Sequence, residues 1–263
     1  MYEYLLFVHE NNILSKIEAN HKGLRSVLKD FYETKYIPMR ETVLSLRFDE
    51  DHLKNFGIAA KIFTDYYKDL IEFRKHFGIN SQSKWDSSFL EEISNYLFKD
   101  VQEIANGEYG IFNKKIYAGL KINTDKQIEI ITKDVDFCIG KMVEIKISDQ
   151  PKERLLLPVV AVEVKTYLDA TMFGEVKSSS KAIRSATPNS KTYVLAGYKS
   201  LADEHLIAAR QDSTLQEIFF MQQDEGFPFD QNTIFTYWKE IVDTINAVSR
   251  DNSITVPGRT LRV

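Results

Sequence analysis

The sequence predicts an α/β fold, in which a mixed central sheet flanked by helices follows a helical N-terminal region. One observation is the apolar run LLLPVVAV (155–162), which lacks polar alternation and is therefore typical of a strand covered on both faces. A second is the segment KTYVLAGY (191–198), another buried strand that follows a segment with helical spacing. The third is the helical spacing of apolar residues near the start of the chain.

The N-terminal region contains two segments with this spacing, 12–35 and 53–77, and Pro38 separates them. The stretch NSQSK (80–84) has the composition of a linker. We therefore expect a helical region over 1–84, which contacts DNA or another subunit, and a second domain over 85–263.

The second domain begins with a predicted helix over 85–104. Five apolar residues lie on one face of this helix, and Asp86, Ser87 or Ser88 is its expected N-cap. The five apolar residues are Leu90, Ile93, Leu97, Val101 and Ile104. The stretch GEYG (107–110) ends the predicted helix.

Strands and further helices follow. We expect a hairpin of strands over 115–122 and 127–140 with a turn at 123–126, an extension over 142–147, and buried strands over 159–165 and 191–198. The expected helices cover 171–186, 203–222 and 232–249, and Asp169 is the expected cap of the first of them.

The composition is that of a soluble globular protein. The chain has 263 residues, of which 43% are hydrophobic and 27% charged. Its single cysteine, Cys138, excludes an internal disulfide and fits a reducing compartment. The start of the chain lacks the basic flank of a secretory signal, so we expect none, and no apolar segment approaches the ~20 residues that cross a bilayer. We expect a cytoplasmic protein that does not contact membranes.

The net charge is −4, but the charges are unevenly distributed. Residues 165–199 contain six basic side chains and two acidic ones, whereas 210–243 contain two basic and seven acidic. Lys177, Lys181 and Arg184 are three or four positions apart, so they form one stripe on the expected helix. Such a stripe is typical either of a solvated surface or of contacts to a phosphate backbone.

Glu163 and Lys165 interrupt the long apolar run. Because they are two residues apart on a strand, both side chains lie on the same face. The pattern Glu-x-Lys occurs four times in the chain, but only this copy lies in a buried run, where charge requires a partner or a metal ion. With Asp136 from the preceding strand, it could hold Mg²⁺, which prefers hard oxygen ligands. The simpler alternative is a strand end that emerges into solvent.

The segments KDVDFCIG (133–140) and VVAVEVKTYLDATM (159–172), with the helix and strand that follow, resemble the PD-(D/E)XK nuclease superfamily. The run EVKTYLDATM (163–172) is similar to type II restriction endonucleases of the BbvCI kind. The resemblance covers roughly residues 85–200 and implies a restriction-endonuclease-like core. Val135 stands where the superfamily name has proline, and Asp134 is a competing first carboxylate.

The resemblance implies that Asp136 and Glu163 are Mg²⁺ ligands and that Lys165 is the catalytic lysine. It also implies an accessory acid on the first core helix, which is Glu91 or Glu92 here; the helical pattern does not choose between them. The expected activity is hydrolysis of phosphodiester bonds in double-stranded DNA at a short specific site. Each chain has one active site, so double-strand cleavage requires a homodimer or a heterodimer with a related subunit in a prokaryotic cell.

Three other hypotheses remain open from the sequence. A repair or junction nuclease could have the same fold, a DNA-binding or assembly subunit could have lost catalysis, and an α/β protein could have no nuclease role. The complete set of Asp136, Glu163 and Lys165 favours an enzyme.

Overall fold

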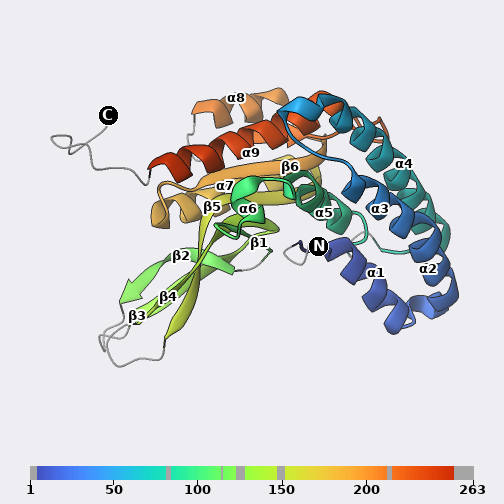
Figure 1. The fold of residues 1–263 in the computed structure, drawn as a ribbon, viewed down its shortest axis with the longest axis horizontal. Helices are drawn as coiled ribbons and strands as arrows, with labels where there is room; N and C mark the ends of the chain where they lie inside the picture. The colour runs from blue at the N-terminus through green and yellow to red at the C-terminus, as the bar shows by residue number, and fades with distance from the viewer. Residues whose placement is uncertain are drawn as a thin grey trace.

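The computed structural model describes residues 5–80, 84–113, 115–122, 128–146, 152–211 and 215–251 (Figure 1). The helices are α1 (Val8–Glu18), α2 (Arg25–Phe31), α3 (Ile37–Ser45), α4 (Leu53–Phe77), α5 (Ser87–Phe98), α6 (Gln102–Ala105), α7 (Ala170–Ala186), α8 (Asp203–Gln211) and α9 (Gln231–Asp251). The strands are β1 (Gly110–Phe112), β2 (Lys115–Ile122), β3 (Ile128–Asp134), β4 (Phe137–Ile145), β5 (Glu153–Leu168), β6 (Lys191–Lys199) and β7 (Glu217–Phe220).

The central sheet is mixed, as predicted. Its strand order is β1-β4-β5-β6-β7, with β5 in the middle. Strand β5 is antiparallel to β4 and parallel to β6. Strands β2 and β3 form a separate two-stranded sheet, in which Ile116 of β2 clusters with Ile183 of α7. The far end of this sheet projects with the outer parts of β4 and β5 away from the helices (Figure 1).

Helices cover both faces of the central part of β5, which explains the apolar sequence there. Val160, Val162 and Val164 belong to the main core together with residues of α5 and α9. On the opposite face, Ala161 packs in a smaller cluster with Ile183 of α7. Because side chains alternate along a strand, Glu163 and Lys165 lie on the α7 side of the sheet.

The N-terminal helices α1–α4 share the main hydrophobic core with α5 and α9. They lie together on one side of the molecule (Figure 1). Pro38 lies in the first turn of α3, which directly continues a π-helical turn over Tyr32–Tyr36. It therefore lies inside a helical stretch, and the prediction that Pro38 separates two helical segments was wrong. The region is helical, as predicted, but it consists of several short helices followed by the long α4. Its expected contact with DNA or another subunit stays a prediction.

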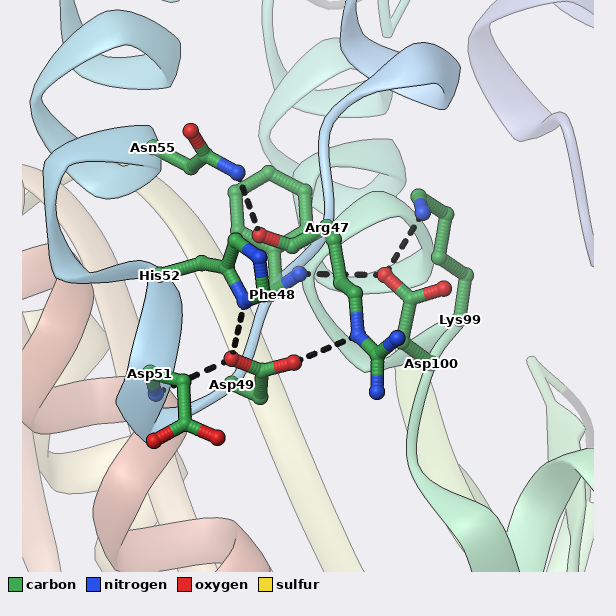
Figure 2. Close-up of polar contacts among 8 residues, drawn as sticks. All are labelled: Arg47, Phe48, Asp49, Asp51, His52, Asn55, Lys99 and Asp100. Carbon is green, nitrogen blue, oxygen red and sulfur yellow. Dashed lines mark hydrogen bonds and ion pairs between the residues drawn. The ribbon is translucent and has the colours of Figure 1, made fainter.

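The connection between α3 and α4 is hydrogen-bonded to Asp100, just after the end of α5 (Figure 2). The backbone N–H of Phe48 donates to Asp100, whose carboxylate also accepts from Lys99 at 2.6 Å. The Lys99 side chain is almost completely buried, with its ammonium 5.6 Å from the centre of the Phe48 ring. Asp49 accepts from His52 in the same connection. These contacts fix the position of α5 relative to the N-terminal helices.

The prediction of one helix over 85–104 was wrong in part, because α5 ends at Phe98 and Gln102 starts the short α6. Val101 has extended backbone angles between the two helices. The pair of buried Lys99 and partly exposed Asp100 accounts for the break, since its contacts with Phe48 lie outside the helical repeat. Asp86 is at the predicted N-cap position, but its side chain makes no capping hydrogen bond.

The predicted helix over 203–222 was also wrong in its second half. Helix α8 ends at Gln211, and Glu217–Phe220 form β7, which is parallel to β6 at the sheet edge. Aromatic and β-branched residues favour a strand there, and the Phe219 ring packs 5.1 Å from that of Tyr237 on α9.

The predicted strand over 127–140 is divided in two, because the chain leaves β3 after Asp134 and enters β4 at Phe137. Strand β4 continues to Ile145 and includes most of the predicted extension. The strands over 115–122 and 191–198, the helix over 171–186 and the helix over 232–249 are confirmed. The expected turn at 123–126 and most of the expected linker lie outside the described residues.

Cys138 is buried with a free thiol. In the described ranges, we find no helix that combines the length and the apolar character needed to span a bilayer.

Candidate active site

A cavity of about 430 Å³ lies where β5, the β3–β4 junction and α7 meet. Its walls carry both acidic and basic side chains, which is unusual for a simple packing defect. These charged residues are Lys84, Lys133, Asp134, Asp136, Glu163, Lys165 and Glu175.

Asp136 is held in place by the backbone of β5. It lies in the bend between β3 and β4, and its Oδ2 accepts a hydrogen bond of 2.8 Å from the N–H of Val164. Val164 is the residue between Glu163 and Lys165, so this contact brings all three predicted residues to one place. Asp134 lines the same cavity from the exposed end of β3, but among the described residues no backbone N–H donates a hydrogen bond to its carboxylate.

Glu163 and Lys165 project from the centre of the sheet into the cavity. Lys165 Nζ is 3.7 Å from Glu163 Oε2, and the two side chains are 25% and 16% exposed. The buried hydroxyl of Ser179 on α7 donates a hydrogen bond of 2.8 Å to Glu163 Oε1. Burial and the nearby Asp136 carboxylate raise the pKa of Glu163, whereas Ser179 and Lys165 oppose that increase.

The tertiary structure distinguishes Glu91 from Glu92. The Glu91 side chain is only 4% exposed, and its Oε1 is 3.7 Å from the ammonium of Lys84, which lines the cavity. Burial and the Asp136 carboxylate raise the pKa of Glu91 to about 7, and Lys84 and Lys165 oppose this. The charge of Glu91 therefore interacts with those of Asp136 and Lys165, two of the three predicted site residues.

Glu92 faces the N-terminal helices instead. Its Oε2 accepts hydrogen bonds from the backbone N–H groups of His9 and Glu10, in the first turn of α1. Its Oε1 accepts from the hydroxyls of Tyr36 and Tyr96, at 2.8 and 2.5 Å. A carboxylate at a helix N-terminus is favourable because unpaired N–H groups and the helix dipole both attract it. Glu92 thus connects α5 to the N-terminal helices.

The donor set fits a hard divalent cation. Asp136 and Glu163 supply carboxylate oxygens in a partly buried place, where their mutual repulsion favours a bound cation. Within the described part of the chain, no cluster of three or more His, Cys, Asp or Glu side chains is arranged to hold a metal ion. Two carboxylates on the wall of one cavity suit a divalent cation that completes its coordination with water molecules.

The basic stripe of α7 does not face the cavity. Glu175, Val176 and Ser179 line the cavity from this helix. At ~100° per residue, Lys177, Lys181 and Arg184 lie roughly 140–200° around the helix from Ser179. Their contact with a DNA backbone stays a prediction, and any such contact would be with DNA beyond the cavity.

Two residues of the site had no clear signal in the sequence. Lys84 lies in the expected linker, shortly before α5, with a positive φ of 58°, and it lines the cavity. Ser179 is one of three consecutive serines on α7, and only the helix orientation selects it.

Comparison with known structures supports the fold. The chain is similar to a structure described as "native BbvCI A2B2 tetramer at low resolution", with a TM-score of 0.76 and 14% sequence identity. The similarity covers 95% of this chain and 99% of the other chain. A search of curated protein sequences gave no significant match.

Comparison with protein families supports the class of enzyme. Residues 82–236, which include every charged residue of the cavity, match the family described as Bpu10I restriction endonuclease. The match covers more than half of the chain, and the expected resemblance to type II restriction endonucleases is confirmed. The chain belongs to the Bpu10I restriction endonuclease family.

Proposed function

We propose that this chain is a Mg²⁺-dependent endonuclease that hydrolyses phosphodiester bonds in double-stranded DNA at a short specific site, with one active site per chain. The observation that carries the proposal is the hydrogen bond from Val164 to Asp136, because it places Asp136, Glu163 and Lys165 around one cavity. Membership of a restriction endonuclease family favours this function over a repair or junction nuclease.

Asp136 and Glu163 would hold the ion, which when bound lowers the pKa of a water molecule and neutralises charge on the phosphate. Ser179 orients the Glu163 carboxylate through its hydrogen bond to Oε1. Lys165, 3.7 Å from Glu163, would position the attacking water and stabilise the developing negative charge. Lys84 and Lys133 add positive charge to the walls, which favours entry of a phosphate.

Glu91 would act as the accessory acid. Its coupling to Asp136 and Lys165 supports this role, whereas the hydrogen bonds of Glu92 support a structural role. A cation bound between Glu91 and Asp136 would lower the raised pKa of Glu91 and keep its carboxylate ionised.

We also propose that the chain acts with a second subunit, either a copy of itself or a related chain. One active site cuts one strand, and the similar BbvCI structure is described as an A2B2 tetramer. Plasmid nicking by this chain alone would support a requirement for a different subunit, and linear products would support a homodimer.

The test is plasmid cleavage in Mg²⁺ with wild type, Lys165→Ala and an EDTA control. Lys146→Ala is the matched control, because Lys146 belongs to another Glu-x-Lys pair and is exposed at the end of β4. We expect discrete fragments or nicks from wild type and Lys146→Ala and none from Lys165→Ala. Equal cleavage by Lys165→Ala would refute the catalytic role, and no cleavage by wild type would favour a non-catalytic subunit.

A further inference from the structure

A second cavity, of about 680 Å³, has lining residues that are close in the sequence to those of the candidate active-site cavity. Thr166 and Tyr167, which follow Lys165 on β5, line it, as does Asp86, two residues after Lys84. Helix α4 and the loop at 222–227 form its other walls. We call it the tyrosine cavity, after Tyr67, Tyr167 and Tyr198 in its lining.

Aromatic side chains dominate its chemistry. The rings of Tyr167 and Tyr198 are stacked, with their centres 5.9 Å apart and their planes 26° from parallel, and both side chains are half-buried. The Phe227 side chain is 50% exposed at the loop wall. Surfaces of this kind bind nucleic-acid bases by stacking.

Asp86 supplies a hydrogen-bond acceptor that is unsatisfied within the described chain. The residue is only 5% exposed, and its Oδ2 lies 2.9 Å from Arg74 Nε. Its Oδ1 is buried and has no hydrogen-bond partner among the described residues. Buried acceptors are almost always paired, so this oxygen requires a donor from a water molecule or from a ligand.

Charged side chains of both signs line the cavity, and Glu72 and Glu225 are acidic. The positive charge comes from Arg74 and from Lys68 and Lys75, which are exposed on α4 and can contact a phosphate. A volume of about 680 Å³ is in the range of cavities that hold small organic ligands.

We propose that the tyrosine cavity binds one base of the target DNA, a base with an exocyclic amino group, displaced from the duplex stack next to the scissile phosphate. The amino group donates to Asp86 Oδ1, which is how acidic side chains recognise the amino group of cytosine. The base ring packs against the tyrosine pair and Phe227. The inference rests on the proposed function, because it assumes that the candidate active-site cavity binds the scissile phosphate.

The first test measures binding instead of cleavage. Duplex DNA with a randomised segment is selected on wild type, Asp86→Asn and Asp65→Asn in EDTA, and the bound sequences are determined. Asp65 is an exposed carboxylate of α4 that does not line the tyrosine cavity, so its variant is the matched control. Circular dichroism and thermal unfolding verify that each variant is folded.

We expect Asp86→Asn to lose the preference at one position and to bind the preferred sequence on the order of 10- to 100-fold more weakly. Asp65→Asn should keep the wild-type preference. An unchanged preference in Asp86→Asn, or an equal loss on all sequences, would overturn the inference. Absence of sequence enrichment with wild type would overturn it as well, whereas plasmid cleavage in Mg²⁺ would still support the proposed function.

The second test addresses displacement from the stack. At the mapped position, the opposite base is replaced by an abasic residue, which removes the cost of unpairing. Wild type should bind the abasic duplex several-fold more tightly than the paired duplex. Phe227→Ala removes an exposed side chain and leaves the Asp86–Arg74 pair intact, and it should bind both duplexes more weakly than wild type does. Weaker binding by wild type to the abasic duplex would show that the base is read within the helix and would refute the proposal.

Discussion

Ser179→Ala is expected to shift the pH dependence of DNA cleavage without removing any proposed metal ligand. The Ser179 hydroxyl donates a hydrogen bond of 2.8 Å to Glu163 Oε1. This hydrogen bond opposes the rise in the pKa of Glu163 that burial and Asp136 cause. Its loss therefore raises the pKa of Glu163 further. Since only the ionised carboxylate binds a cation, the acidic limb of the rate profile moves to higher pH.

The magnitude follows from the hydrogen bond. A hydrogen bond to a charged group contributes about 1.5–3 kcal/mol, and one pKa unit corresponds to about 1.36 kcal/mol. The full loss would therefore raise the pKa by ~1–2 units. Water that enters the open cavity replaces part of the lost bond, so we expect a shift of roughly 0.5–1 unit.

The assay is single-turnover cleavage across a pH series at a Mg²⁺ concentration below saturation. Ser178→Ala is the matched control, because Ser178 is the exposed neighbour of Ser179 on α7. The rates of Ser179→Ala and wild type should converge at high pH, where Glu163 is ionised in both. A uniform loss of rate at every pH, or an unshifted acidic limb, would refute the proposed link between Ser179 and the ionisation of Glu163.

Three further predictions concern the scaffold of the site. Glu92→Gln should lower the free energy of unfolding, measured by urea denaturation, by about 1–3 kcal/mol, because the amide cannot accept from all four donors. Glu91→Gln should reduce cleavage and leave stability nearly unchanged, and equal stability of the two variants would contradict the structural role of Glu92. Gly197→Ala should destabilise the protein by about 1–3 kcal/mol, since its Cβ would lie 2.2 Å from the Thr166 carbonyl oxygen, and Gly174→Ala, with no atom within 4 Å, should be neutral or stabilising in the same thermal unfolding assay. Burial and Lys16 lower the pKa of His9 from 6.5 to about 3, so the unfolded state binds the proton first, and the stability that His9 contributes falls as the pH decreases from about 6.5 towards 3. Burial raises the pKa of Glu92 from 4.5 to about 7, and this opposes the His9 effect above pH 4.5. His9→Gln should therefore flatten the dependence of stability on pH mainly below pH 4.5, and an unchanged dependence would be evidence against a buried neutral His9.

Local sequence patterns were sufficient for the centre of the fold. The apolar run of β5 predicted a strand covered on both faces, and the spacing of Glu163 and Lys165 placed both side chains on one face. Asp169 was correctly predicted as the cap of α7, where it accepts from Met172 N–H. These features depend on neighbours within a few residues, so the sequence contains the information directly.

Only the tertiary structure decided how distant segments meet. Glu91 and Glu92 are adjacent and equally acidic, and packing of α1 against α5 assigns Glu92 to the N-terminal helices and leaves Glu91 near Asp136. The break at Lys99–Asp100 depends on Phe48, and β7 exists because β6 provides a parallel partner. A helical or strand period specifies which side chains share a face, but the partner of that face comes from elsewhere in the chain.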